Sequence, residues 1–340
     1  MDKKLFALVV SGALSGAAAA QSSVTVYGVL DTYYTHDSGG SSAGAVSAID
    51  GGFASLNGTR LGFRGREDLG NGMAALFTAE MGFGGDTGAL DASGNGFGRQ
   101  SFVGLQGSAG VVKLGRQYNP LFNGGVKYDP FLGGLEGAYS RVISLGAGKR
   151  LNNALVYATP ANLGGFSAEA AYGFGEVAGS NAQGRVLALS VGYVAGPFSA
   201  NLIHNSANNI PLAAASMVTT KNTGVGASYG LGWGTLSVLY QFNRNDAQLG
   251  ALDNHDLLLG TTFPFGASTV MASYIRHKNH VIANADSNQS SLGYSYGLSK
   301  RTTLYASYAR IANQGAASIA TSGHLGGVDR QLNTGINHAF

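Results

Sequence analysis

Two short segments of the chain carry residue types that could do chemistry. Residues 40–44 read Gly-Ser-Ser-Ala-Gly, the G-x-S-x-G spacing that presents a nucleophilic serine in many hydrolases. That motif requires a strand before it and a helix after it, whereas here it falls in a serine- and glycine-rich loop. His277 and His280 could ligate a metal, but no third ligand stands nearby at a suitable spacing. The chain has no cysteine for thiolate chemistry. We therefore expect no enzyme activity, no cofactor and no metal.

A different kind of chemistry is carried by residues 57–66. Arg60, Arg64 and Arg66 fall on one face of an extended chain, and Leu61 and Phe63 fall on the other, because side chains two positions apart share a face of a strand. Guanidinium groups stay charged at any working pH. A strand with arginine on one face and apolar side chains on the other suits a wall between water and lipid.

Composition supports a wall of this kind. Charged residues make up 11% of the chain, well below the roughly 25% usual for soluble domains. Beyond residue 20 no uninterrupted apolar stretch reaches the roughly 18 residues of a membrane helix, and the mean hydropathy of +0.07 is too low for a helical bundle. The formal net charge of +3 is too small to favour nucleic-acid binding. The composition favours a transmembrane β-barrel.

The N-terminus indicates export. Lys3 and Lys4 precede an apolar, small-residue stretch that ends in Ala18-Ala19-Ala20, which is the pattern of a cleaved secretory signal. We expect residues 1–20 to be removed, and residues 21–340 to form one barrel domain without disulfides.

Period-two alternation predicts the elements that position these side chains. Short glycine-rich turns alternate along the chain with long polar segments. The turns include residues 68–72 and 107–110, and the long segments are residues 36–56, 83–96, 205–218 and 312–327. Barrels with short periplasmic turns and long external loops show this alternation. The even number of strands brings both termini to the same side. We predict sixteen strands, at residues 22–34, 57–66, 73–82, 97–107, 111–118, 150–158, 165–175, 183–194, 198–206, 219–230, 233–243, 254–264, 268–277, 289–296, 302–311 and 328–340.

Aromatic residues gather near the predicted strand ends, where two interfacial girdles would lie. A soluble β-sandwich core would also use Tyr and Phe, but it rarely needs so many strands or such polar loops. The predicted girdle residues are Tyr33, Tyr34, Tyr157, Tyr172, Phe174, Tyr193, Phe198, Tyr229, Trp233, Phe263, Phe265, Tyr294 and Tyr296.

Several motifs along the mature chain resemble the trimeric, sixteen-stranded general porins of Gram-negative bacteria, particularly the β-proteobacterial type. They are SSVTVYGVLD (22–31), TRLGFRGREDLGNGMAALFTAE (59–80), FGRQSFVGLQGSAGVVKLGRQYNPLF (97–122), RLNNALVYATP (150–160), LSKRTTLYASY (298–308) and TGINHAF (334–340). The resemblance implies an outer-membrane homotrimer, in contact with outer-membrane lipid and lipopolysaccharide, through which small hydrophilic solutes and ions diffuse. It also implies that residues 119–149, which lack alternation, form the third long loop and fold into the lumen.

The resemblance further assigns the constriction of the pore. Arg60, Arg99 and Arg150 match the wall arginines of the family, and alternation independently places Arg60 and Arg150 on polar faces. Asp129 and Glu136, the carboxylates of the inward loop, are expected opposite them. The basic loop residues Lys127, Arg141 and Lys149 tip the balance toward anions. Weaker candidates for the lumen are Arg64, Arg66, Glu80, Lys127 and Arg141.

Two other functions remain open from the sequence: an outer-membrane adhesin and a barrel enzyme. A barrel enzyme would need Ser, His and an acid near one rim, whereas the charges here recur along many strands. An adhesin would not need charges in the lumen at all.

Overall fold

The computed structural model describes residues 23–40, 44–52, 54–91, 94–161, 163–209, 217–247, 251–321 and 324–340. The predicted signal sequence at residues 1–20 and the central residues 41–43 of the G-x-S-x-G segment lie outside this part of the chain.

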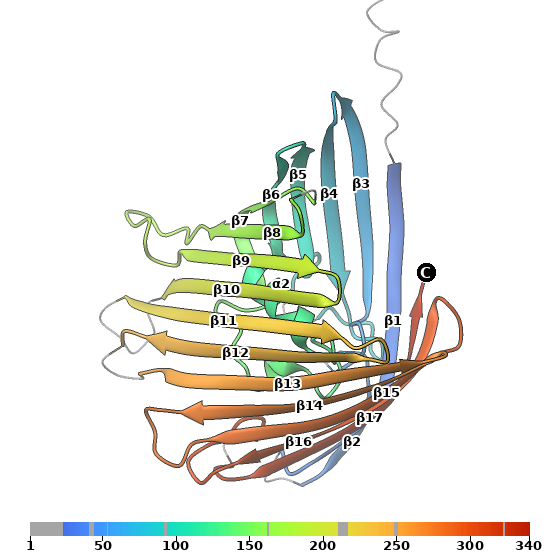
Figure 1. Cartoon of the computed structure of the whole chain (residues 1–340), viewed down its shortest axis with the longest axis vertical. Coiled ribbons are helices and arrows are strands. Elements are labelled where there is room, and N and C mark those ends of the chain that lie inside the picture. The colour runs from blue at the N-terminus through green and yellow to red at the C-terminus, as the bar shows by residue number, and fades with distance from the viewer. Residues whose placement is uncertain are drawn as a thin grey trace, which may run out of the picture.

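The described chain is almost entirely β-structure, arranged as one sheet (Figure 1). Among the described residues, no helix is long and apolar enough to cross a membrane. The strands are β1 (Ser23–Ser38), β2 (Val46–Asp50), β3 (Arg60–Gly70), β4 (Met73–Gly82), β5 (Gln100–Gly107), β6 (Gly110–Tyr118), β7 (Arg150–Ala158), β8 (Phe166–Gly173), β9 (Val186–Ala195), β10 (Phe198–Asn209), β11 (Val218–Gly230), β12 (Thr235–Asn245), β13 (Asp253–Phe265), β14 (Ser268–Asn279), β15 (Ser287–Gly297), β16 (Thr302–Asn313) and β17 (Val328–Ala339).

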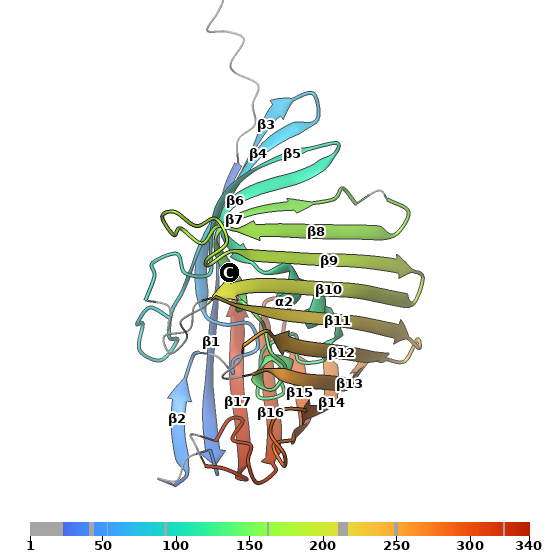
Figure 2. The same ribbon diagram turned by 90° about the vertical axis from the view of Figure 1, so that its left-hand side faces the viewer.

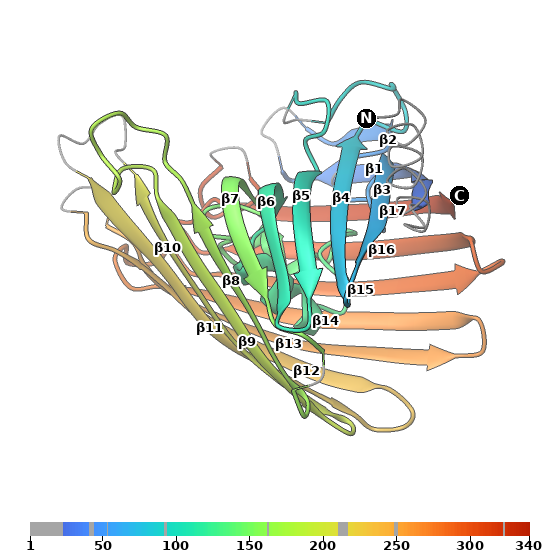
Figure 3. The same ribbon diagram turned by 90° about the horizontal axis from the view of Figure 1, so that it is seen from above.

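The sheet closes into a barrel of sixteen strands. From β3 to β17 each strand pairs antiparallel with the next along the chain, and β1 closes the ring by pairing with both β17 and β3. The short strand β2 pairs with the C-terminal part of β1 at residues 33–37. Closure leaves no sheet edge for lipid to face, which a spanning sheet requires. Figure 3, seen from above, shows β3 to β7 in front of β14 to β17, as the sheet curves back on itself.

The sixteen predicted strands are confirmed, and two of them, 73–82 and 150–158, have the predicted ends. The prediction of a plain loop at residues 36–56 was wrong in part, because β1 continues to Ser38 and β2 occupies Val46–Asp50. The loop predicted at 205–218 is shorter than expected, because β10 continues to Asn209.

Each strand presents two different faces. On β12, Leu236, Tyr240 and Phe242 are exposed on the outer face, whereas Leu239 and Gln241 on the inner face are 0% and 1% exposed. Ten of the predicted girdle aromatics are likewise exposed on the barrel surface: Tyr34, Tyr157, Phe174, Phe198, Tyr229, Trp233, Phe263, Phe265, Tyr294 and Tyr296.

Tyr33 corrects the predicted girdle. It is 3% exposed, and its ring packs inside the barrel with Phe131, Leu135 and Tyr305. Its neighbour Tyr34 is exposed, because consecutive strand residues face opposite sides. Tyr172 and Tyr193 are half-buried.

The long segment between β6 and β7 folds into the barrel. It contains α2 (Pro120–Gly125) and two single turns of 3₁₀-helix, η2 (Val126–Tyr128) and η3 (Tyr139–Arg141). Asn119 caps α2 by accepting a hydrogen bond from the Leu121 amide at 3.0 Å. Figures 1 and 2 show α2 on the inner side of β9 to β11. We call residues 119–149 the inward loop.

Apolar contacts hold the inward loop to one arc of the inner wall. Tyr128 and Tyr139 of the loop belong to one buried cluster with inward-facing residues of β10 to β16, namely Ile203, Leu239, Leu258, Ile275 and Ile311. Polar wall residues hold the loop backbone: the Ser237 hydroxyl donates to the Tyr128 carbonyl at 2.8 Å, and the Gln289 amide donates to the Gly137 carbonyl at 3.0 Å. The loop therefore narrows the lumen toward the opposite arc, β3 to β7.

Candidate functional site: the lumen constriction

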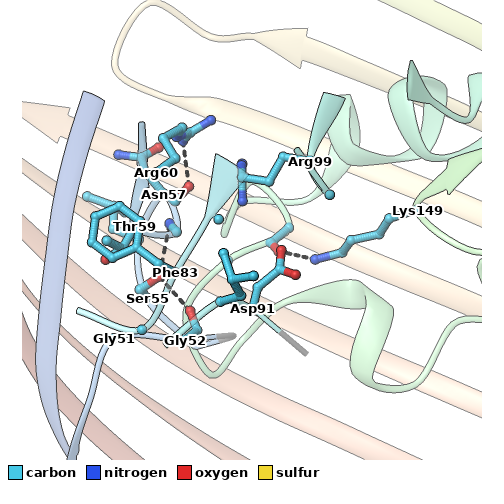
Figure 4. Close-up of a pocket in the computed structure, with 18 of the residues that line it drawn as sticks. Gly51, Gly52, Ser55, Asn57, Thr59, Arg60, Phe83, Asp91, Arg99 and Lys149 are labelled. Atoms are coloured by element: carbon cyan, nitrogen blue, oxygen red, sulfur yellow. Dashed lines mark hydrogen bonds between the residues drawn. The ribbon is translucent and has the colours of Figure 1, made fainter. Parts of the chain in front are cut away.

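A cavity of ≈ 710 Å³ lies between the inward loop and the arc of wall from β3 to β7. Figure 4 shows Arg60, Arg99 and Lys149 among the side chains around it. The loop contributes mainly apolar surface and glycine, including Phe122, Val126 and Gly133. The cations that line this cavity are Arg60, Arg99, Arg116, Lys149 and Arg150. The three wall arginines predicted from the sequence therefore come together here.

Glu80 joins Arg60 and Arg99 into one cluster. The Arg99 Nε donates to Glu80 Oε1 at 2.7 Å, and Arg60 Nη1 lies 3.8 Å from Glu80 Oε2. The hydroxyl of Tyr27 donates to the same carboxylate at 2.9 Å. The Glu80 side chain is 3% exposed, whereas those of Arg60 and Arg99 are 20% and 13% exposed. The carboxylate is thus covered, while part of each guanidinium faces the opening.

Tyr118 positions two guanidinium groups at one point. Its hydroxyl accepts hydrogen bonds from Arg99 Nη2 and Arg150 Nη2, both at 3.1 Å. The Arg150 guanidinium also lies 4.7 Å from the centre of the Tyr118 ring, a distance at which a cation is attracted to the ring face. The ring in turn stacks on Phe122 of the inward loop. Tyr118 therefore holds like charges close together that would otherwise move apart, a role that the sequence did not reveal.

Arg116 lines the cavity where the pairing of β6 with β7 is irregular. Strict alternation from Lys113 would turn Arg116 to the outer face, but the pairing of β6 with β7 shifts between Gly115 and Gln117. Gly115 adopts φ +127°, and a Cβ there would lie 2.2 Å from the Ser101 carbonyl oxygen, so only glycine fits. Arg116 Nε then donates to the Gly98 carbonyl at 2.6 Å. A glycine inside a strand was the one signal for this bulge in the sequence.

Lys149 is the cation that the inward loop contributes to the cavity. Its ammonium donates to the Gly133 carbonyl at 3.2 Å and lies 5.3 Å from the centre of the Phe122 ring. Burial, together with the nearby charges of Arg150 and Arg99, lowers the pKa of Lys149 to about 8. The charge on this side chain therefore changes within an accessible pH range.

Raising the pH from 7 to 9 is expected to weaken the preference of the channel for anions. With a pKa of about 8, Lys149 is about nine-tenths protonated at pH 7 and about one-tenth at pH 9. Loss of one charge beside the ion path should lower the anion-to-cation permeability ratio by a few-fold, up to about eightfold. Reversal potentials in a salt gradient measure this ratio. Lys149→Arg keeps its charge at both pH values and should abolish the change. An unchanged pH dependence in that variant would assign it to another group.

Asp129 does not face the cavity of wall cations. It is 2% exposed, and its carboxylate accepts backbone hydrogen bonds from Phe131 (3.1 Å), Gly133 (2.9 Å) and Tyr139 (3.1 Å). The expectation that Asp129 stands opposite the wall arginines is therefore corrected: it ties three points of the inward loop together. Burial raises its pKa to about 6. Because the pKa of Asp129 is higher in the folded loop than in an unfolded chain, protonation of Asp129 favours the folded loop. Acidification through pH 6 therefore does not release the loop through this residue.

Glu136 is also buried within the loop, at 1% exposed. It forms an ion pair with Arg141, whose guanidinium also reaches Asp329 of β17 at 3.0 Å. The expectation that Glu136 stands opposite the wall arginines is therefore also corrected. Arg141, a weaker candidate for the lumen, instead fastens the inward loop to the wall. Burial raises the pKa of Glu136, which Arg141 partly offsets.

The remaining candidates lie along the lumen but apart from the wall cluster. Arg64 lies 5.2 Å from the centre of the Tyr27 ring, and Arg66 donates to the Gln106 side chain at 2.7 Å. Lys127 lines a second cavity of ≈ 440 Å³, on the far side of the inward loop, with hydroxyl groups from β12 to β16.

His277 and His280 do not form a joint site. The His277 ring bonds to Asp256 at 2.7 Å inside the barrel, whereas the His280 ring lies tilted at 54° against that of His255, with ring centres 4.4 Å apart. Within the described residues, no group of three or more His, Cys, Asp or Glu side chains could hold a metal ion.

Comparison with known proteins agrees with this geometry. The sequence pattern of the Gram-negative porins matches residues 6–316. The chain belongs to the Gram-negative porin family. Outer membrane porin protein 32 of Delftia acidovorans is 35% identical to it over the whole length of both chains. The solved structure of an anion-selective porin from Comamonas acidovorans superposes with a TM-score of 0.82 at 32% identity, over 94% of this chain and 100% of the other. OmpT of Vibrio cholerae, solved in a trimer form, shares the fold at 16% identity, with a TM-score of 0.72 over 94% of this chain and 99% of the other.

The barrel is thus an outer-membrane porin, and its lumen is a route for small hydrophilic solutes. The wall arginines and the inward loop line opposite sides of one cavity in that lumen. A porin of this kind discriminates by the size of the opening and by the field of the fixed charges around it.

Proposed function

We propose that this porin passes small hydrophilic solutes by diffusion with a preference for anions, and that Arg60, Arg99 and Arg150 set this preference. The observation that carries the proposal is the charge around the opening. Five cations line the cavity against three carboxylates, Asp50, Asp86 and Asp91, and the carboxylate of Glu80 lies covered beside Arg60 and Arg99. The structurally similar Comamonas acidovorans porin is described as anion-selective, which supports the same direction here.

The magnitude follows from Coulomb's law. A unit charge about 7 Å from an ion in water contributes about 0.6 kcal/mol, so its effects on an anion and a cation differ by about 1.2 kcal/mol, or about eightfold in permeability ratio. Salt screens this effect over about 10 Å at 0.1 M. The preference should therefore be strongest in dilute salt.

Three further statements belong to the same proposal. Residues 1–20 are a cleaved export signal and residues 21–340 are the mature barrel. The functional unit is a homotrimer, as in the trimer form of the Vibrio cholerae protein. The barrel contacts outer-membrane lipid and lipopolysaccharide, binds no nucleic acid, and is not an enzyme.

Planar-bilayer recording tests the proposal. Purified porin should give steady, ohmic single-channel conductance, and in a salt gradient the reversal potential should have the sign of an anion-preferring pore. A zero or cation-favouring reversal potential would overturn the anion preference. Absence of steady conductance would instead favour an adhesin or a barrel enzyme.

A further inference from the structure

Leu132 of the inward loop is an apolar side chain that stands in the water-filled lumen. At 66% exposed, it is the most exposed large apolar side chain in the part of the chain that the structure describes. The exposed leucine and valine residues of the strands lie on the outer face of the barrel, where lipid covers them. Leu132 instead lines the cavity that holds the wall cations. Apolar surface in water costs free energy, so a leucine at this place is favourable only when something covers it.

A fixed turn of the backbone presents Leu132. Its amide donates to the Asp129 carbonyl at 3.0 Å. The amides of its two neighbours, Phe131 and Gly133, both donate to the Asp129 carboxylate, at 3.1 and 2.9 Å. Leu132 has φ +53°, a left-handed conformation that glycine and asparagine adopt more readily than leucine. The leucine is therefore unfavourable in two ways, in its backbone and in its exposure, and this combination indicates a use for its side chain.

Leu132 lies where two cavities of the lumen meet. It lines both the cavity of ≈ 710 Å³ that holds the wall cations and the second cavity of ≈ 440 Å³, and Leu56 and Asn57 also line both. Two of the three residues at this meeting point are therefore leucines. A solute that moves from one cavity to the other passes them.

Two wall cations border this meeting point. Arg60 Nη2 donates to the Asn57 carbonyl (Figure 4). A Cβ on Gly58, the next residue, would lie 3.0 Å from Arg99 Nη1. Arg99 uses Nε and Nη2 for the bonds described above, and its Nη1 forms no hydrogen bond to any residue that the structure describes. A donor of Arg99 is thus available to an anion beside the two leucines.

We propose that this meeting point binds monocarboxylates that carry a compact apolar body, such as an aromatic ring. The inference deepens the proposed function and rests on it. The carboxylate pairs with Arg99 or Arg60, because hydrogen bonds between ionised groups are the strong ones. The apolar body covers Leu132, which removes the surface of both from water. Inorganic anions and hydrophilic carboxylates make only the first of these contacts, so they bind more weakly.

Reduction of the chloride current by two carboxylates tests this proposal. The probes are benzoate and nicotinate, which have the same charge at pH 7 and nearly the same shape, but nicotinate has a polar nitrogen in its ring. Each is added to single porin channels in a planar bilayer at constant potassium chloride, and its dissociation constant is obtained from the loss of current. The test variants are L132N and L132M, and asparagine suits the left-handed backbone at this position. The matched control is L298N, because Leu298 is 56% exposed in the turn between β15 and β16 and lines neither cavity.

Benzoate is expected to bind the wild type about fivefold more tightly than nicotinate, since about 40 Å² of apolar contact with one leucine corresponds to about that factor. L132M keeps an apolar side chain and should keep this ratio, as should L298N, whereas L132N should lower it to about one. Equal affinities of the two carboxylates for the wild type, or an unchanged ratio in L132N, would overturn the proposal. An equal loss of the ratio in L132M and L132N would assign it to the shape of the turn and would also overturn the proposal.

The reversal potential of the wild type in a potassium chloride gradient separates this inference from the proposed function. Anion preference together with equal affinity for benzoate and nicotinate refutes only the apolar contact with Leu132. A zero or cation-favouring reversal potential refutes the anion preference, whatever the two carboxylates do.

Discussion

The variant R60Q/E80Q/R99Q/R150Q is expected to lose most of the preference for anions. It removes three cations and one carboxylate at the opening, a net loss of two positive charges. At about eightfold for each charge in dilute salt, the anion-to-cation permeability ratio should fall by at least about tenfold after screening. Reversal potentials across a planar bilayer measure the fall. Single-channel conductance should stay within about twofold, because glutamine is smaller than arginine and does not close the opening.

Glu80 is included because its carboxylate is buried between Arg60 and Arg99. Removal of both arginines alone would leave a buried charge without a partner, at a cost of about 3–5 kcal/mol. Arg66→Gln is the matched control. It changes an arginine of the same strand, six residues or about 20 Å along β3 from Arg60, and should leave the selectivity nearly unchanged. An equal effect of Arg66→Gln would mean that charge throughout the lumen, not the cluster at the opening, sets the preference.

The variant Asp129→Ala is expected to release the inward loop from the wall. It removes the acceptor of three backbone N–H groups, those of Phe131, Gly133 and Tyr139. A buried N–H without an acceptor costs about 1–3 kcal/mol, so the three together cost about 3–9 kcal/mol, a large part of what the apolar contacts of the loop contribute. Single-channel conductance should rise by about half to twofold and become noisier, as the loop no longer fills one side of the lumen. The barrel itself should stay folded, because its strand pairing does not involve Asp129.

Asp129→Asn removes the charge and keeps part of the hydrogen bonding. The amide oxygen can still accept from Gly133 and Tyr139, but the amide nitrogen cannot accept from Phe131, so conductance should lie between those of the wild type and Asp129→Ala. Conductance at the wild-type level in Asp129→Ala would show that the apolar cluster around Tyr128 and Tyr139 holds the loop without the carboxylate. A rise in Asp129→Asn equal to that in Asp129→Ala would show that the hydrogen bonds from Gly133 and Tyr139 do not by themselves hold the loop.

The inward loop obstructs part of the lumen, and it also forms one side of the cavity that the wall arginines line. Its surface toward the wall arginines is apolar and glycine-rich, apart from Lys149. Without a carboxylate from Asp129 or Glu136 on that side, nothing on the loop balances the guanidinium groups opposite. The wall arginines therefore favour anions without a set of opposite charges across the lumen.

The sequence by itself was sufficient to predict the strands and which of their side chains face water or lipid. A strand that separates water from lipid must alternate, and alternation is local, so the pattern along 57–66 or 233–243 could be read without knowledge of the fold. Arg60 lies on the polar face of its strand, because Leu61 and Phe63 occupy the alternate positions that face lipid. The family resemblance supplied the inward course of residues 119–149, and also Arg99.

Only the tertiary structure decided which way the loop carboxylates point. Asp129 and Glu136 lie in irregular backbone without a period, so no local pattern could show that one gathers three amides and the other pairs with Arg141. The bulge at Gly115, which turns Arg116 inward, depends on how β6 meets β7. The apolar inner residues of β10 to β16 and the buried Tyr33 depend on where the loop lies. These features arise from contacts between segments far apart in the chain, and such contacts leave no periodic trace in either segment.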